Sequence, residues 1–187
     1  MPLPRFDRLP PGTRAAILAV ARSHFARAGR HEASFNQIIA DAGISKTTAY
    51  HYFDGKDDLF AAVVADVTGR TLTALGPWAE AGTAEALWEQ VTAGTHRLLA
   101  HLRDHPDDRA VLAGASLSEQ SSPWIDHLVG NALRLGLIDT HPDLELITMA
   151  TAAVIGTVDG WALRRPDANP GEALIILLRR LWNTPQK

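Results

Sequence analysis

Residues 35–60 read FNQIIADAGISKTTAYHYFDGKDDLF. Within this run, residues 43–56 hold two tyrosines, a histidine, two threonines and two lysines. A buried helix would carry leucines at these positions, and a solvated helix would carry mostly charged residues. Large polar rings gathered on one short segment therefore indicate a surface that contacts another molecule.

Two short helices are predicted on either side of a turn at residues 42–44. Ser34 followed by Gln37 fits a capping box at the start of the first helix, and Ser45 is a good N-cap for the second. Gly43 suits the turn because it accepts a positive φ without a Cβ clash. The pattern predicts a helix-turn-helix, whose second helix enters the DNA major groove and presents its N-terminal residues to base edges.

The rest of the chain is also predicted to be helical, because apolar residues recur at spacings of three and four. The first helix is expected from Thr13, as N-cap, to Ala28, with Gly29 ending it. Further helices are expected at about 54–75, 83–105, 107–115, 123–135, 142–164 and 170–182. The predicted fold is all-α with about nine helices. A three-helix DNA-binding domain at residues 1–54 precedes a larger helical domain at residues 55–187.

Composition limits the classes of protein. The chain has no cysteine, which excludes disulfides and thiolate metal sites. No stretch reads as the roughly eighteen apolar residues of a membrane span, and the N-terminus lacks a signal-peptide core; a cytoplasmic location without a membrane partner is expected. Residues 1–60 hold eight Lys or Arg and six Asp or Glu, a net charge of +2, whereas residues 61–187 hold ten and fifteen, a net charge of −5. The basic part is thus the N-terminal third, which weakly favours nucleic acid there.

The helix-turn-helix segment contains Ile38-Ile39, Ala42-Gly43-Ile44-Ser45, the aromatic run Tyr50-His51-Tyr52-Phe53 and Lys56-Asp57-Asp58-Leu59. Through these residues the chain resembles the DNA-binding domain of TetR-type transcriptional regulators. It departs from the usual pattern at Ile39, where alanine is common, at Thr47, where glycine is common, and at Ala49, where leucine is common. These departures affect the packing of the two helices rather than the expected DNA contacts.

The resemblance implies a set of DNA contacts. Base edges would be read by Lys46, Thr47 and Tyr50, and phosphates would be bound by Thr48, Tyr52 and Lys56. His51 would do either, Ser34 would touch the backbone, and Asn36 lies where the family often places a base-reading side chain. The alternatives are an aromatic cluster packed on the next helix and ordinary solvated lysines. Arg5 and Arg8 would form either an arm for the minor groove or a disordered tail.

The last two predicted helices are apolar around much of their circumference, which indicates deep burial or a partner. In TetR-like proteins these helices form a four-helix dimer interface, to which Gly156 and Gly160 would bring close helix approach. The alternative is that both helices only close the core of a monomer. The expected interface residues are Val154, Val158, Leu174, Leu177, Leu178 and Leu181.

The middle helices would enclose a ligand pocket if the resemblance extends to them, although the same residues fit a plain core. The expected lining is Trp88, His96, Leu99, Leu117, Trp124, Leu128 and Trp161. No cofactor or metal site is indicated, because His96, His101 and His105 do not share one helix face.

The resemblance implies a homodimeric repressor that a small, largely apolar effector releases from a palindromic operator in double-stranded DNA. The alternatives are a ligand-independent regulator acting through protein contacts and a non-DNA helical enzyme or binding module. No nucleophile–base set or glycine-rich phosphate loop supports an enzyme.

Overall fold

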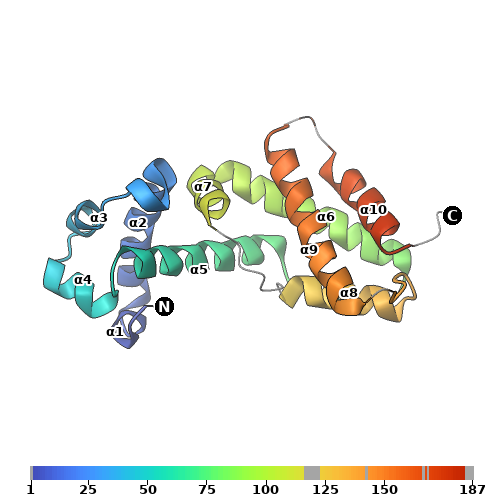
Figure 1. The fold of residues 1–187 in the computed structure, drawn as a ribbon, viewed down its shortest axis with the longest axis horizontal. Helices are drawn as coiled ribbons and strands as arrows, with labels where there is room; N and C mark the ends of the chain where they lie inside the picture. Colours follow the sequence, from blue (N-terminus) through green and yellow to red (C-terminus); the bar gives the residue numbers. More distant parts are fainter. Residues whose placement is uncertain (1, 116–122, 142, 166, 168, 184–187) are drawn as a thin grey trace. The chain divides into compact units, whose positions relative to one another are not determined.

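The structure, a computed structural model, describes residues 2–115, 123–141, 143–165, 167 and 169–183. These residues contain ten α-helices and no strand (Figure 1), which confirms the all-α prediction. The helix that the sequence pattern did not predict is α1. The helices are α1 (Pro4–Asp7), α2 (Pro11–Glu32), α3 (Phe35–Asp41), α4 (Lys46–Tyr52), α5 (Lys56–Leu75), α6 (Ala84–Asp104), α7 (Pro106–Gly114), α8 (Pro123–Arg134), α9 (Leu144–Leu163) and α10 (Pro170–Leu181).

The chain divides into two compact units. The first comprises Met1–Thr71 together with Asp104–Leu117, and the second comprises Leu72–Arg103 together with Ser118–Lys187. Helix α7 therefore belongs to the same unit as α1–α4, although more than forty residues separate it from them along the chain. The expected boundary after residue 54 is a functional division, and it stays a prediction.

Local signals set most helix ends in the first unit. Gly29 has φ 74° and interrupts α2 near its end, where the sequence predicted a C-terminal glycine. Ser34 Oγ accepts a hydrogen bond from Gln37 N at 3.4 Å. The reverse half of the capping box is absent, because the Gln37 side chain donates to Asp41 Oδ1 instead, at 3.0 Å. The prediction of Thr13 as an N-cap is wrong: α2 begins at Pro11, with Pro10 as N-cap.

The core of the first unit is built from aromatic and aliphatic side chains of five helices. Phe25 and Phe60 meet edge to face, with ring centroids 5.0 Å apart. Phe53 and Ile38 have no exposed surface, and Val111 of α7 joins the same cluster. Burial of these side chains holds the two short helices α3 and α4 in place, since helices of seven residues are not stable alone.

The N-terminal segment is packed against the first unit, contrary to the expectation of an arm or a disordered tail. Phe6 of α1 is 2% exposed. Its ring lies 4.6 Å from Phe53 and 6.0 Å from Tyr52, measured between centroids. The backbone N–H of Leu3 donates to the Tyr52 carbonyl at 2.9 Å. Helix α1 is thus attached to the C-terminal end of α4.

The second unit has its own core between α6, α8, α9 and α10. Trp182 stacks on Trp88 with ring centroids 5.3 Å apart, and its Nε1–H donates to Thr151 Oγ1 at 3.0 Å. Asn131 is buried and satisfied by backbone, since its amide group both accepts from and donates to Ala81 at 2.7 and 3.0 Å. A buried amide with both halves paired is a structural tie rather than a free ligand-binding group.

Helix α9 differs from the expectation that no segment is apolar enough to span a membrane. By length and composition Leu144–Leu163 meets that requirement, although only 22% of its apolar window is buried within the chain. The exposed apolar side chains on it include Leu146 and Met149. The described residues of the chain thus leave part of the apolar surface of α9 uncovered.

Candidate nucleic-acid interface

The turn between α3 and α4 is closed by backbone hydrogen bonds. Gly43 has φ +67°; its N–H donates to Ala40 O at 3.0 Å, and Ile44 N–H donates to Ile39 O at 3.1 Å. This pair of bonds is the Schellman arrangement, which ends a helix through a left-handed residue. The sequence prediction of a glycine turn at this place is confirmed.

Helix α4 has an inner and an outer face. Its N-cap Ser45 accepts a hydrogen bond from Thr48 N at 3.1 Å, and the two hydroxyl groups lie 2.8 Å apart. Ala49 has no exposed surface and faces the core. Residues on the other side of the helix, Lys46 and His51 among them, are exposed. The packing therefore fixes α4 by one face and leaves the other free for a partner.

Tyr50 stands on this outer face. It is 49% exposed, whereas the other described Phe, Tyr and Trp side chains are buried or half-buried. Its ring lies 5.7 Å from that of Phe35, centroid to centroid, at 57° between planes. Phe35 belongs to the first turn of α3, so this contact restrains Tyr50 without burying it. A restrained aromatic ring loses little conformational entropy when it binds.

The first turn of α3 lies beside α4. Ser34 and Asn36 are exposed there, as expected for residues that approach DNA. Helix α3 is fastened to α2 by His24, whose Nε2 lies 2.8 Å from Asp41 Oδ2. The same carboxylate group accepts from Gln37, so the position of α3 does not depend on packing alone.

Tyr52 is less available than Tyr50. It is half-buried and packs on the core cluster of the first unit. Its ring contacts those of Phe6 and Phe53. The alternative of an aromatic cluster thus applies to Tyr52, although its partners are α1 and the chain after α4 rather than α5.

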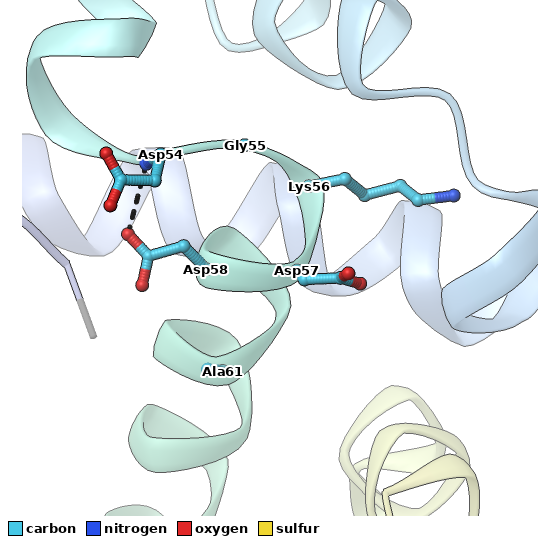
Figure 2. Close-up of a pocket in the computed structure, with 6 residues that line it drawn as sticks. All are labelled: Asp54, Gly55, Lys56, Asp57, Asp58 and Ala61. Atoms are coloured by element: carbon cyan, nitrogen blue, oxygen red, sulfur yellow. Dashed lines mark hydrogen bonds between the residues drawn. The ribbon is translucent and has the colours of Figure 1, made fainter.

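Lys56 also has an intramolecular role. Its Nζ donates to the backbone carbonyl of His31 at 2.5 Å, which ties the start of α5 to the end of α2. Figure 2 shows the Lys56 side chain extending away from Asp54 and Asp58 at the start of α5. Asp58 Oδ2 accepts from Asp54 N at 3.2 Å.

The start of α5 carries more negative than positive charge. Asp54, Asp57 and Asp58 surround a shallow hollow with Lys56 as its one cation. The Arg30 guanidinium 3.0 Å from Asp57 lowers the pKa of that carboxyl. Ionised carboxylates near the positive end of a helix stabilise it, but they repel a phosphate. The outer face of α4 has no acidic residue and is the better anion-facing surface.

The N-terminal region matches a known family. A sequence model described as "Bacterial regulatory proteins, tetR family" matches residues 17–63, which include α3, the turn and α4. A search of curated proteins gave no match. The match covers the segment whose outer face is described above.

Solved structures share the whole fold. A TetR family regulator from Shewanella sp. PV-4 is 20% identical with a TM-score of 0.70, over 91% of this chain and 96% of that one. A TetR-like regulator from Rhodococcus sp. RHA1 is 25% identical with a TM-score of 0.60, over 93% and 96%. SmeT, the repressor of the Stenotrophomonas maltophilia multidrug efflux pump SmeDEF, is 18% identical with a TM-score of 0.62, over 90% and 87%.

The chain is thus similar to TetR-family transcriptional regulators in fold, and its residues 17–63 match the family's DNA-binding domain. It is a DNA-binding protein with a helix-turn-helix, and its relatives are transcription regulators rather than enzymes.

The residues expected to line an effector pocket are brought together only in part: Trp88 and Leu128 share the core of the second unit, and Trp124 packs against it. Leu99 and Leu128 are fully buried in the second unit, whereas His96 is exposed. Trp124 contacts Trp78 with ring centroids 4.9 Å apart. Trp161 is half-buried under the Arg165 guanidinium, 5.7 Å from its ring, and Leu117 lies outside the described residues.

Two of those residues do share a groove. Trp88 and His96 of α6 face Ile175 and Arg179 of α10 around a hollow of about 420 Å³. The Arg179 guanidinium lies 5.3 Å from the centre of the Trp88 ring. An adjoining hollow of about 430 Å³ shares His96 and Ile175 and continues to Asn169 and Glu172. Hollows of this size fall within the range of small-molecule sites.

The residues expected at a dimer interface fall into two groups. Val158, Leu174 and Leu178 are at most 3% exposed in the single chain, so their side chains serve its own core. Leu177 is 40% exposed, and Val154 and Leu181 are half-buried. The larger exposed apolar residues are Leu144, Leu146, Met149, Ile176 and Leu177, of which the sequence pattern identified only the last.

The two glycines of α9 do not serve close helix approach inside the chain. A Cβ at Gly156 would meet no atom within 4 Å, and one at Gly160 would meet only the Arg164 side chain at 3.7 Å. Close helix approach inside the chain occurs instead at Gly171 of α10, where a Cβ would lie 2.6 Å from Thr92 Cγ2 of α6.

Among the described residues, no three His, Cys, Asp or Glu side chains form a possible metal site.

Proposed function

We propose that the outer face of α4 reads base edges in the major groove, with Lys46, Thr47 and Tyr50 as the reading residues. The observation that carries this is the division of α4 into a locked inner face and an exposed, polar and aromatic outer face. Lys46 forms no ion pair with any described residue, so its charge is available. Lysine and tyrosine side chains donate to the acceptors that purines present in that groove.

Residues around this face would bind the sugar–phosphate backbone. Ser34, Asn36 and His51 are exposed and carry donors, and Thr48 is half-buried beside Ser45. Lys56 would bind a phosphate only by giving up its bond to the His31 carbonyl. Tyr52 would contribute through the polar edge of a ring that is otherwise packed. We therefore expect Tyr52 to matter more for the placement of α4, and Lys56 more for the contact between α5 and α2, than for affinity.

The proposed active species is a homodimer formed through α9 and α10. Leu146, Met149 and Leu177 are exposed by 53%, 50% and 40% in the single chain. Gly156 has open space beside it, where a second helix would fit closely. Two copies related by a two-fold axis would read a palindrome with half-sites one helical turn or a small multiple apart.

The proposed response is release of DNA by a small, largely apolar effector bound in the second domain, residues 55–187. The groove between α6 and α10 supports this, because it combines the Trp88 ring and Ile175 with the polar groups of His96 and Arg179. SmeT is a repressor, and repression is the mode we propose here. An effector acts only if it binds the DNA-free conformation better than the DNA-bound one. A DNA reader of this kind works beside the bacterial chromosome, and we propose a cytoplasmic location.

Selection of purified protein on random-sequence duplex DNA, at moderate salt and without ligand, tests the proposal. We expect enrichment of a palindrome. Tyr50→Ala and Lys46→Ala should each lose about 1–3 kcal/mol of discrimination between operator and random DNA. Arg109→Ala, an exposed arginine on α7, is the control and should change nothing. Equal losses on operator and random DNA would contradict base reading by α4.

Tyr50→Phe separates the two contributions of that residue. Tyr50→Phe keeps the ring on Phe35 and removes only the hydroxyl group. If it loses as much discrimination between operator and random DNA as Tyr50→Ala does, the hydroxyl group makes the DNA contact. If only Tyr50→Ala loses discrimination, the ring makes the DNA contact.

Sedimentation of Met149→Glu and Leu177→Glu tests the dimer. Both variants should be monomeric, because each places a charge in the middle of the apolar surface. Ala65→Glu, at an exposed position of α5, is the control and should remain dimeric. Dimers in all three variants would place the interface elsewhere. Titration of the operator complex with small apolar compounds tests release, and absence of any response would favour a ligand-independent regulator.

A further inference from the structure

The N-terminal segment carries cations to one end of α4. Arg5 and Arg8 are exposed, on either side of the buried Phe6. Neither arginine forms an ion pair with another described residue. Arg14 reaches the same segment and donates from Nη1 to the Asp7 carbonyl at 3.4 Å. Asp7 contributes the only acidic side chain of residues 1–31, so the segment has a surplus of positive charge.

The attachment of α1 makes its position depend on α4. The Leu3 N–H bonds to the Tyr52 carbonyl, which is the last residue of α4. Phe6 contacts the rings of both Tyr52 and Phe53 and is 2% exposed. Side chains on the two sides of Phe6 point away from this core. Arg5 and Arg8 are therefore carried on a short helix that moves with the end of α4.

The length of α4 brings that end to the edge of the major groove. Helix α4 has seven residues, which corresponds to a length of about 10 Å. The major groove of B-DNA is about 12 Å wide. A helix of this length that occupies the groove has both ends close to the phosphates that border it. Arginine is the side chain best suited to a phosphate, because its planar fork donates two parallel hydrogen bonds.

We propose that Arg5 and Arg8 of α1 form a second DNA contact, which binds backbone phosphates beside the half-site that α4 reads. This inference rests on the proposed function and adds to it a non-sequence-specific clamp at the C-terminal end of α4. Phe6 is the positioning residue, because it holds α1 on Tyr52 and Phe53. The ligand chemistry is the phosphodiester group, and no base is read.

The test compares Arg5→Gln/Arg8→Gln with a control of the same charge change, Arg103→Gln/Arg109→Gln, whose arginines are exposed on α6 and α7. Affinity for operator and random duplex DNA is measured over a range of salt concentrations. Each lost phosphate contact reduces the slope of log K against log salt by about 0.9. The Arg5/Arg8 variant should therefore lose about 1.8 in slope for each DNA-binding domain, on both DNAs, and the control should lose none.

A slope equal to that of the control overturns the inference. A loss confined to A·T-rich flanking sequence also overturns it, since that result would show base reading in the minor groove rather than phosphate binding. If the wild-type chain shows no sequence preference and no salt-dependent binding, the proposed function itself fails. Wild-type binding with an unchanged variant slope leaves that function intact and removes only the clamp.

Phe6→Ala tests the positioning role. It keeps both arginines but releases α1 from α4, and it should shift the salt slope towards that of the Arg5/Arg8 variant. Thermal unfolding distinguishes this from general misfolding: the Arg5/Arg8 variant should unfold at the wild-type temperature, because exposed arginines contribute little to stability. A Phe6→Ala chain that folds and keeps the full wild-type slope would show that attachment of α1 is not needed.

Discussion

Replacement of Asp108 by asparagine should destabilise the first unit strongly. Asp108 lies in the first turn of α7 and is 1% exposed. Its Oδ1 accepts a hydrogen bond from Arg70 Nη2 of α5 at 2.5 Å and lies 3.4 Å from Arg22 Nε of α2. Asp66 completes the cluster, 3.3 Å from Arg70 Nε. Two carboxylates and two guanidinium groups from three helices thus balance in charge.

The variant removes one charge from this balance. Asp66 remains for both arginines, so the cluster changes from neutral to a net charge of +1 in a largely buried place. Removing one partner of a buried ion pair costs about 3–5 kcal/mol. Because Arg22 and Arg70 are 21% and 33% exposed, water compensates part of the loss, and we expect the lower end, about 3 kcal/mol. For a chain of this size that corresponds to a fall in melting temperature of about 6–12 °C.

Urea unfolding followed by circular dichroism measures the loss, with Asp107→Asn as the matched control. Asp107 is the neighbouring carboxylate in the same turn and forms no ion pair with a described residue. Its loss removes only the favourable interaction with the helix dipole, about 0.3–1 kcal/mol. Hydrogen exchange should localise the effect of Asp108→Asn to α7 and the facing parts of α2 and α5.

A second substitution tests the cause. If the cost comes from an orphaned arginine, Arg70→Met in the Asp108→Asn background should recover part of the stability. Stabilities of Asp108→Asn and Asp107→Asn within 1 kcal/mol of each other, or a purely additive double variant, would refute the reasoning that the ion cluster fastens α7 to the first unit.

Three further predictions concern single residues. Burial without a hydrogen-bond partner raises the pKa of the Asp159 carboxyl from 3.8 to about 7. The folded chain therefore keeps the Asp159 proton at pH values where the unfolded chain has lost it. This proton's contribution to the free energy of unfolding is complete below pH 3.8 and is lost as the pH rises to 7. Asp159→Asn should flatten that decline in unfolding free energies measured between pH 4 and 8, and an unchanged profile would contradict it. Ser45→Ala should cost about 1 kcal/mol in urea unfolding through loss of the N-cap of α4. Gly171→Ala should cost about 1–3 kcal/mol by overpacking against Thr92, and Thr92→Ser should restore most of it by removing the opposing methyl group.

Much of the helix-turn-helix was predictable because its signals are local. Ser34, Gly43 and Ser45 each act through hydrogen bonds to residues at most five positions away. The same is true of Asn169, the N-cap of α10, whose side chain accepts from Glu172 N, and of Pro170 after it. Local hydrogen bonds leave a fixed spacing in the sequence, and the helix-turn-helix follows from that spacing.

The exposed apolar residues of α9 and α10 were harder to predict. Both helices are apolar on more than one face, so periodicity does not tell which leucines serve the core and which remain exposed. Leu177 and Leu178 are neighbours in the chain, yet one is 40% exposed and the other has no exposed surface. The expected pocket residues stay a prediction for a similar reason, since a buried tryptophan or leucine fits a core as well as a cavity.

By itself, then, the sequence determined the described helices other than α1, many of their ends, and the turn of the helix-turn-helix. Only the tertiary structure decided that α7 belongs with the N-terminal helices, that Asp108 is a buried ionic tie, and that α1 is docked through Phe6. Each of these depends on groups far apart in the chain: Phe6 meets rings more than forty residues away, and Asp108 meets arginines on two other helices. A short helix with a single buried ring has no pattern of its own, because the site that buries the ring exists only after α4 has folded against its neighbours.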